Sequence, residues 1–301
     1  MDKWISLHTH TGYSLLDGSA KIKDIISRTK ELGMDSIAIT DHGVMFGCVE
    51  FYKEAIAQGI KPIIGCEVYV AAKSMDIKQN SGENQTYHLV LLVKDETGYS
   101  NLMKIVSEAS INGFYYKPRT DKNFLKEHSQ GLIALSACLG GEIQSYILED
   151  NIKKAEATAL EYKSIFGEDF YLELQYHGIE DQLKVNRELI DMSKRLSIPL
   201  VATNDIHYIY KEDSVSHDVL LCIQTAKTVN DEDRMRYPSE QFYLRSPEEM
   251  YEIFSYVPEA LENTVKIAEK CNYNYEFHKS KLPKYPLESD ADPFEYLREL
   301  C

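Results

Sequence analysis

An apolar run that ends in two histidines, Trp4-Ile5-Ser6-Leu7-His8-Thr9-His10, lies near the start of the chain. A short apolar run of this kind predicts a strand. Side chains two positions apart on a strand point to the same side, so His8 and His10 are expected to share one face. The stretch therefore predicts a strand that carries a pair of polar, potentially metal-binding groups at its end.

The alternation of apolar runs with helical spacing continues from this stretch to residue 203. Seven apolar runs predict strands, and most of them are separated by stretches with the apolar spacing of a helix. Strands joined through a helix pair in parallel, so parallel β-α-β units are expected. The predicted strands span residues 4–7, 36–40, 61–70, 89–93, 132–135, 170–174 and 200–203, and the helices between them span 21–32, 48–58, 98–110, 153–165 and 181–196.

The positions of the polar residues decide between two α/β architectures. In a doubly wound open sheet they gather at one switch point, whereas in a barrel the ends of all strands contribute to one rim. Polar residues follow nearly every predicted strand, so we expect an α/β barrel over residues 1–210. Helical spacing after residue 208 predicts a helical appendage over 211–301. Its last amphipathic stretch, 293–301, suggests that the appendage leads toward further domains.

Composition narrows the class of protein. The 301 residues are 44% hydrophobic, so a sizeable core is expected. Six cysteines without a C-x-x-C pair favour a reduced, cytoplasmic protein over a disulfide scaffold or a zinc ribbon. No signal peptide and no run of 18 apolar residues is found, so no membrane partner is expected. The net charge of −15 opposes binding to a phosphate backbone, so bound cations or a partner would have to supply the attraction.

Potential metal ligands gather at the predicted strand ends. Imidazole, carboxylate and thiolate groups are the ligands that Zn²⁺, Mn²⁺ and Fe²⁺ select. Any single pair of them is more often structural, but their recurrence at several strand ends favours a metal site. His88 fits less well, because it precedes its apolar run. The candidates at strand ends are His8, His10, Asp17, His42, Glu67, Cys138, Asp205 and His207.

The number of these groups exceeds the needs of one metal ion. Paired dications promote phosphoryl displacement, so hydrolysis of a phosphate ester is the leading chemistry and amide hydrolysis is the competing one. Three other site classes leave no trace in the sequence: G-x-S-x-G, G-x-x-x-x-G-K-[ST] and a strand-linked G-x-G-x-x-G.

Five motifs resemble the polymerase and histidinol phosphatase (PHP) family, and in particular the amino-terminal PHP domain of bacterial DNA polymerase III alpha subunits. The likeness covers the whole chain. The motifs are residues 7–18 (Leu-His-Thr-His-Thr-Gly-Tyr-Ser-Leu-Leu-Asp-Gly), 38–43 (Ala-Ile-Thr-Asp-His-Gly), 113–119 (Gly-Phe-Tyr-Tyr-Lys-Pro-Arg), 202–208 (Ala-Thr-Asn-Asp-Ile-His-Tyr) and 237–244 (Tyr-Pro-Ser-Glu-Gln-Phe-Tyr-Leu).

The resemblance implies a distorted seven-unit (β/α) barrel with up to three divalent metal ions, Zn, Mn or Fe, on its rim. It implies three ligand sets, and it includes His88 among the ligands. The first set is His8, His10, Glu67 and Asp205; the second is Glu67, His88 and Cys138; the third is Asp17, His42 and His207.

The resemblance also implies an activity, a metal-dependent 3′–5′ exonuclease of the proofreading type, with His10, Glu67 and Asp205 as catalytic residues. Its partners would be the 3′ end of DNA, the remaining polymerase domains of the same subunit and replisome proteins. The polymerase active site of such a parent protein is not expected in this chain. Two alternatives stay open, a metal-stabilised scaffold without turnover and a stand-alone phosphomonoesterase of the histidinol phosphatase kind.

Further residues have less specific expectations. Lys117 and Arg119 are expected to contact the DNA phosphate, with a solvated charge pair on a loop as the alternative. Asp41 is expected to orient His42 or another ligand. His177, after the sixth predicted strand, is expected to be a polar surface residue.

Overall fold

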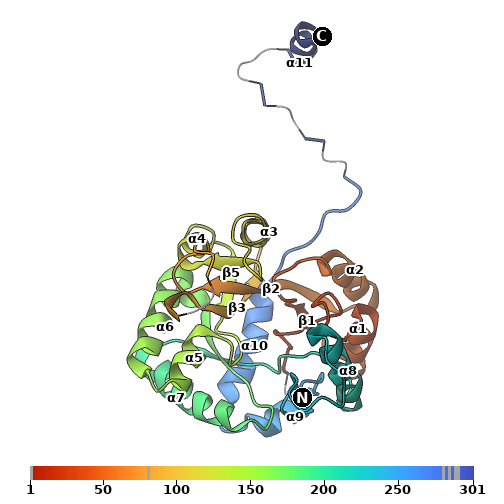
Figure 1. Ribbon diagram of the computed structural model, residues 1–301. Coiled ribbons are helices and arrows are strands. Elements are labelled where there is room, and N and C mark those ends of the chain that lie inside the picture. Colours follow the sequence, from red (N-terminus) through yellow and green to blue (C-terminus); the bar gives the residue numbers. More distant parts are fainter. Residues whose placement is uncertain (1–2, 80–81, 280–281, 284–285, 288–291) are drawn as a thin grey trace.

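The computed structural model describes residues 3–79, 82–279, 282–283, 286–287 and 292–301. Within these ranges, seven strands form one curled sheet surrounded by helices, so the expected α/β barrel with C-terminal helices is confirmed (Figure 1). The strands are β1 (Ser36–Ile39), β2 (Lys61–Ala71), β3 (Thr86–Val93), β4 (Arg119–Asp121), β5 (Leu132–Leu135), β6 (Phe170–Leu174) and β7 (Leu200–Ala202). The helices are α1 (Ile22–Glu31), α2 (Cys48–Gln58), α3 (Glu96–Ile111), α4 (Lys122–Glu127), α5 (Glu142–Leu148), α6 (Ile152–Phe166), α7 (Glu180–Leu196), α8 (Ser214–Thr225), α9 (Pro247–Ile253), α10 (Pro258–Lys270) and α11 (Pro293–Leu300).

The sheet runs in the order β1-β2-β3-β5-β6-β7, and β4 pairs with β2 outside this path. The amino-terminal segment closes the ring between the two ends of this order. On one side Ser6 forms a bridge with Ile37 of β1, and on the other side Thr9 forms a bridge with Ile206, which follows β7. His8 and His10 are thereby fixed at the seam of the barrel.

The strand predicted over residues 4–7 is wrong, because this segment makes only isolated bridges. Backbone hydrogen bonds there are interspersed with bonds to hydroxyl groups. The carbonyl of Ser6 accepts from the amide of Ala38 at 2.8 Å, but the amide of Ile5 donates to Thr264 Oγ1 at 3.1 Å and the amide of Thr9 donates to Thr40 Oγ1 at 2.7 Å. The pattern of apolar residues is that of a strand, but side chains take part of its backbone hydrogen bonds, so no continuous ladder forms.

One strand runs against the others, which corrects the expectation of a wholly parallel sheet. β3 pairs antiparallel with both β2 and β5, and the register places His88 opposite Tyr69. The chain returns from β2 to β3 without an α-helix between them, so no parallel crossover is formed. The start of β3 therefore lies at the same rim as the ends of its parallel neighbours, and His88 reaches that rim.

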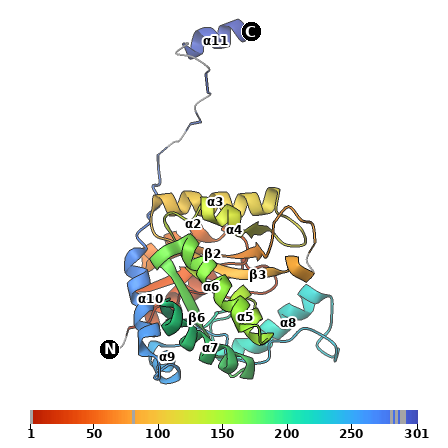
Figure 2. The ribbon, with the colours of Figure 1, turned by 90° about the vertical axis from the view of Figure 1, so that its left-hand side faces the viewer.

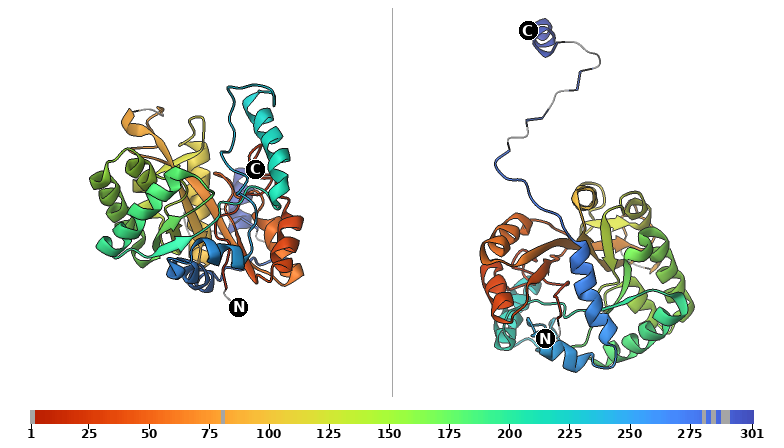
Figure 3. Two further views of the ribbon diagram at one scale, coloured as in Figure 1. Left: turned by 90° about the horizontal axis from the view of Figure 1, so that it is seen from below. Right: turned by 180° about the vertical axis from the view of Figure 1, so that it is seen from behind.

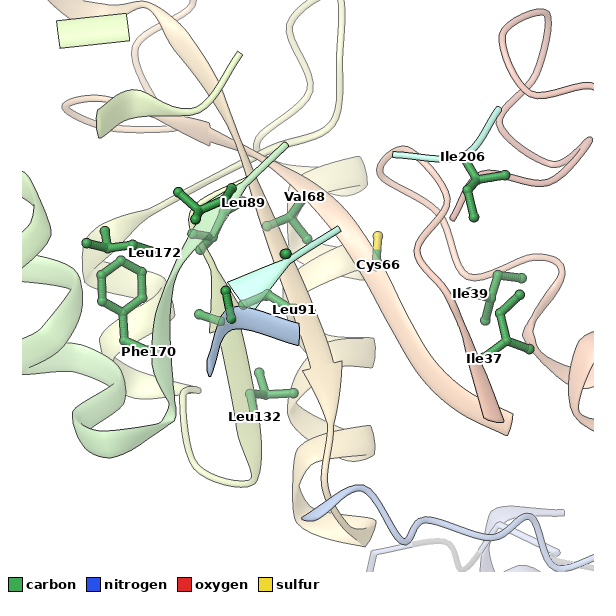
Figure 4. Packing of buried hydrophobic residues seen from close by; sticks show 14 of the residues in the cluster. Ile37, Ile39, Cys66, Val68, Leu89, Leu91, Leu132, Phe170, Leu172 and Ile206 are labelled. Atoms are coloured by element: carbon green, nitrogen blue, oxygen red, sulfur yellow. The ribbon is translucent and has the colours of Figure 1, made fainter. Parts of the chain in front are cut away.

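Alternate side chains of the strands build two apolar layers. One layer packs between the sheet and the surrounding helices, and it includes Ile37, Val68, Leu89 and Leu172 (Figure 4). The other layer fills the inside of the barrel and consists of Ile5, Leu7, Ala38, Ile63, Val90, Leu92, Ile133, Leu135, Ala137, Tyr171 and Val201, with Ile267, Ala268 and Cys271 from the end of α10.

Helices α8, α9 and α10 pack against the barrel, whereas α11 lies apart from it (Figure 1). α10 crosses one end of the ring (Figure 3), and its Asn263 donates to the carbonyl of Leu200 in β7 at 2.8 Å. α8 lies at the other end (Figure 2). The division of the chain at residue 210 stays a prediction. Among the described residues, no helix combines the length and the apolar character that crossing a bilayer requires.

Candidate metal centre

The rim opposite α10 collects imidazole, carboxylate and thiol groups from six parts of the chain. They come from the amino-terminal segment, the loops after β1, β5 and β7, the middle of β2 and the start of β3. All nine ligands implied by the family resemblance lie in this one cluster, which we call the rim cluster: His8, His10, Asp17, His42, Glu67, His88, Cys138, Asp205 and His207.

The first group of the rim cluster joins the seam of the barrel to β2. His8 Nε2 lies 3.4 Å from Glu67 Oε1 and 3.3 Å from Asp205 Oδ1. His10 Nε2 lies 3.4 Å from Glu67 Oε2 and 3.2 Å from the same oxygen of Asp205. Two imidazoles and two carboxylates thus face one point, as a divalent cation requires.

The other two groups share Glu67 with the first. His88 Nδ1 lies 2.9 Å from Glu67 Oε1 and 3.6 Å from Cys138 Sγ. On the opposite side, His42 Nδ1 lies 2.6 Å from Glu67 Oε2, and its Nε2 lies 3.1 Å from Asp17 Oδ2. His207 Nε2 completes this third group at 3.9 Å from Asp17 Oδ2. Glu67 is therefore placed between all three groups, as a bridging carboxylate would be.

Buried atoms without hydrogen bonds provide a test of whether the rim cluster fits metal ions. Buried polar atoms are nearly always hydrogen-bonded, and exceptions require an explanation. Within the described part of the chain, six atoms that face one another in the cluster have no such partner: His8 Nε2, His10 Nε2, His42 Nδ1, Glu67 Oε2, Asp205 Oδ1 and His207 Nε2. Their chemistry is that of a site for divalent metal ions, so the residues fit the group that the family implies.

Three imidazoles have an acceptor next to Nδ1, on the side of the ring that faces away from the cluster. His8 Nδ1 lies 2.7 Å from Glu173 Oε1, and His10 Nδ1 lies 3.0 Å from Ser14 Oγ. His207 Nδ1 lies 2.9 Å from the carbonyl oxygen of Asp205. An Nδ1–H that donates outward leaves the Nε2 lone pair directed into the cluster, which is the tautomer that binds a metal.

Asp41 acts behind His10 rather than on His42. Its Oδ1 accepts hydrogen bonds from the backbone amide of Thr11 and from Ser14 Oγ, both at 2.7 Å. The hydroxyl of Ser14 therefore points its hydrogen at Asp41 and its lone pairs at His10 Nδ1. This geometry supports the expectation that Asp41 orients a ligand.

Burial and charge set the protonation of the cluster. Burial, together with the neighbouring His42 and His207, lowers the pKa of His10 to about 3. Burial alone would raise the pKa of Glu67, but the imidazoles of His88, His42 and His8 hold it well below its usual range. The neighbouring carboxylates raise the pKa of His8 well above its usual range and that of His42 to about 10, although burial opposes both shifts. Binding of a cation would therefore release protons from these two imidazoles.

The backbone at Asp205 is held in a left-handed conformation, with φ of 45°. A non-glycine residue in this region costs of the order of 1 kcal/mol, and such residues concentrate at functional sites. Asp205 and His207 follow β7 and do not lie on a strand. They approach each other in a turn, with His207 Nδ1 3.7 Å from Asp205 Oδ1.

Sequence reasoning missed three residues around the rim cluster. Glu173, at the core of β6, is buried and also accepts a hydrogen bond from the amide of Ala137. Tyr237 donates from its hydroxyl to Asp17 Oδ1 at 3.1 Å, and His217 Nε2 lies 2.7 Å from the Asp17 carbonyl oxygen. Tyr237 and His217 lie 220 and 200 positions from Asp17, so no local spacing signals them.

The structure contradicts the predicted role of Arg119. Its side chain is 0% exposed, and its guanidinium donates to the backbone carbonyls of Met75, Ile77, Gln79 and Gly113 at 3.0–3.2 Å. The guanidinium therefore links the connection between β2 and β3 to the loop after α3 and is not available to bind DNA. Lys117, in contrast, is exposed, and its Nζ lies 3.2 Å from the Tyr69 hydroxyl, whose ring packs against His42 and His88.

His177 is buried, so its expected position on the surface is wrong. Its Nε2 lies 2.8 Å from the carbonyl oxygen of Asn204, its Nδ1 faces Gln182 Nε2 at 2.7 Å, and its ring stacks on Phe242. Nδ1 accepts a hydrogen from Gln182, so it has no room for a proton. Burial accordingly lowers the pKa of His177 to about 4.

This environment predicts a pH-dependent loss of stability. The unfolded chain binds a proton at His177 below pH 6.5, whereas the folded chain does so only below about 4. The free energy of unfolding therefore falls as the pH drops through this window, by about 2 kcal/mol at pH 5 from this residue. Urea unfolding at pH 7 and pH 5 should show a smaller difference for His177→Phe than for the unmodified chain. An equal difference would contradict this prediction.

Comparisons with known proteins agree with the geometry. The PHP domain family matches residues 6–177. The chain is 48% identical over 301 residues to DNA polymerase III subunit alpha of Borreliella burgdorferi, which covers 99% of this chain and 26% of that protein. It is 46% identical over 308 residues to the same subunit of Thermus aquaticus, covering 99% of this chain and 25% of that protein. The chain thus spans about a quarter of the length of these relatives.

A solved structure is similar at a lower level. It is a candidate metal-dependent phosphoesterase from Bifidobacterium adolescentis, with a TM-score of 0.44 and 14% identity, covering 67% of this chain and 87% of that one. The family match spans more than half of the residues, and it includes five of the six segments that build the rim cluster. The chain belongs to the PHP domain family.

Proposed function

We propose that this chain is the PHP domain of a DNA polymerase III alpha subunit and that it removes nucleotides from the 3′ end of DNA by metal-dependent hydrolysis. The observation that carries the proposal is the set of six buried, unpaired ligand atoms that face one another in the rim cluster. The likeness to DNA polymerase III alpha subunits over 99% of the chain supports the choice of DNA as substrate.

The rim cluster would hold up to three divalent ions, Zn, Mn or Fe, through its three groups. Such ions act as Lewis acids on a phosphate oxygen and promote attack by water. His10, Glu67 and Asp205 belong to the group at the barrel seam and are proposed to be the catalytic residues. Glu67 would contribute to all three groups, because its Oε1 faces His8 and His88 and its Oε2 faces His10 and His42.

The hydroxyl and carboxyl groups behind the ligands keep the site ready for substrate. Glu173 fixes His8, and Asp41 fixes His10 through Ser14, so neither imidazole has to reorient when substrate binds. Preorganised groups of this kind lower the barrier, because no reorganisation is needed during the reaction. Lys117 lies at the edge of the cluster, where a DNA phosphate would approach.

Removal of the Lys117 charge should weaken DNA binding without changing the chemistry. Lys117→Ala is expected to raise KM for an oligonucleotide, and to reduce the slope of log KM against log salt concentration by about one, as the loss of one phosphate contact does. The kcat for a small phosphodiester should stay unchanged. Lys104→Ala, which removes an exposed lysine on α3, is the matched control. An unchanged salt slope in Lys117→Ala would contradict a phosphate contact.

Digestion of a 5′-labelled single-stranded oligonucleotide tests the proposed function. With Mn²⁺ or Zn²⁺ the chain should produce a ladder that shortens from the 3′ end, and EDTA should abolish it. Bound metal without any cleavage would favour the metal-stabilised scaffold. Much faster hydrolysis of a small phosphate monoester than of the oligonucleotide would favour a phosphomonoesterase of the histidinol phosphatase kind.

The similarity to DNA polymerase III alpha subunits suggests which partners the chain has. We propose that the chain works in the cytoplasm beside the remaining polymerase domains of the same subunit and other replisome proteins. The net charge of −15 opposes unaided DNA binding. Delivery of the 3′ end by the polymerase domains would overcome this repulsion.

A further inference from the structure

A cavity of about 410 Å³ lies beside the third group of the rim cluster. It is enclosed between α8 and the segment that contains Tyr237, and we call it the α8 cavity. Its wall includes Tyr208, Val215, His217, Arg234, Arg236 and Tyr237.

The α8 cavity and the rim cluster share part of one wall. Tyr237 and His217 line the cavity, and the same two residues contact Asp17 through the hydrogen bonds described above. The Tyr237 ring also packs edge-on against His207. The cavity therefore lies directly beside the third group, and a ligand that reaches past Tyr237 and His217 would contact both places.

The charges on the wall of the cavity cancel. Arg234 forms two hydrogen bonds with Asp218, at 2.5 and 2.6 Å, and the remaining cation, Arg236, is matched by Glu240. A cavity that selects a phosphate would carry excess positive charge. These balanced walls suit the uncharged part of a ligand instead.

The other features of the wall suit a nucleobase. Two tyrosines line the cavity, and Val215 adds an apolar edge that is 72% exposed. The Arg234 guanidinium on the same wall is held in place by Asp218. The volume lies in the range of small-molecule sites, about 300–1,000 Å³. Stacking on an aromatic side chain beside polar groups is typical of sites for unpaired bases.

We propose that the α8 cavity binds the base of the 3′-terminal nucleotide while the phosphate of that nucleotide lies at the rim cluster. This inference rests on the proposed function, since it assigns a place to one part of the proposed substrate. It also explains why residues beyond the matched family region, Tyr208 and those of α8, line the approach to the cluster.

Equilibrium binding of two probes tests the proposal without relying on turnover. Calorimetry with Mn²⁺ present compares thymidine 5′-monophosphate with deoxyribose 5-phosphate, which differ only by the base. The 301-residue chain should bind the nucleotide at least about tenfold more tightly, the size of effect expected from base stacking. Val215→Trp, which fills the edge of the cavity, should reduce this preference to about twofold or less.

Val219→Trp is the matched control, because Val219 is exposed one turn further along α8 and does not line the cavity. It should keep the full preference and should hydrolyse bis(p-nitrophenyl) phosphate at the rate of the unmodified chain. Equal binding of the two probes by the unmodified chain would overturn the proposal, as would a preference that survives in Val215→Trp. If the unmodified chain prefers the nucleotide but does not cleave oligonucleotides, the proposed exonuclease activity is refuted, whereas the assignment of the cavity as a base-binding site stands.

Discussion

Replacement of Asp205 by asparagine will lower the rate of phosphodiester hydrolysis by at least about a thousandfold, which corresponds to about 4 kcal/mol of transition-state stabilisation. Asparagine keeps the size of the side chain but removes its charge. Asp205 Oδ1 lies between His8 Nε2 and His10 Nε2 at 3.3 and 3.2 Å, so the variant places a neutral amide where a cation needs a carboxylate. Initial rates on the labelled oligonucleotide and on bis(p-nitrophenyl) phosphate measure the effect.

Asp35→Asn is the matched control for this variant. Asp35 is exposed and pairs with Lys3 at 2.9 Å, away from the rim cluster, so the same change should leave the rate within about twofold. Circular dichroism of Asp205→Asn should match that of the unmodified chain, because the fold rests on the two apolar layers. Full activity of a folded Asp205→Asn variant would refute the assignment of the site.

Replacement of Arg119 by alanine will destabilise the fold by about 3–5 kcal/mol, the range for loss of a buried hydrogen-bond network. The guanidinium satisfies the carbonyls of Met75, Ile77 and Gln79 on the connection between β2 and β3, and of Gly113 after α3. Alanine removes four hydrogen bonds at once, although the carbonyls of Ile77 and Gln79 keep a donor in Asn84 Nδ2. It also opens a cavity where a fully buried side chain was packed.

Urea unfolding followed by circular dichroism measures this loss. Lys117→Ala lies two positions away in the same loop, but Lys117 is exposed, so its effect should stay within about 0.5 kcal/mol. A loss below about 1 kcal/mol in Arg119→Ala would show that water replaces the guanidinium at these carbonyls.

Apolar spacing predicted most elements of the barrel, because the helices and strands bury one continuous stripe or face. The strands at Leu132–Leu135 and Phe170–Leu174 begin and end as predicted. The direction of β3 was not predicted, although the sequence between β2 and β3 shows no helical spacing. Without a helix the connection cannot be a parallel crossover, and this signal also explains why His88 precedes its apolar run.

The two kinds of site residue differ in how far the sequence reveals them. Ligands follow strands, so their local spacing together with the family resemblance brought out all nine members of the rim cluster. In the sequence, Glu173 is a single charged residue within an apolar strand. Its contact with His8 joins residues 165 positions apart, so no local spacing indicates it. The role of Arg119 could not be predicted in the same way. An arginine at this position has the same local sequence whether its guanidinium faces solvent or four buried carbonyls.

Metal content tests the central claim, that the rim cluster is a site for divalent ions, most directly. The purified chain is incubated with Mn²⁺ or Zn²⁺, passed through a desalting column and analysed by inductively coupled plasma mass spectrometry. We predict more than one equivalent of metal per chain, and a loss of most of it in Glu67→Gln, because Glu67 contacts all three groups. No bound metal in the folded chain, or the same content in Glu67→Gln, would contradict the account.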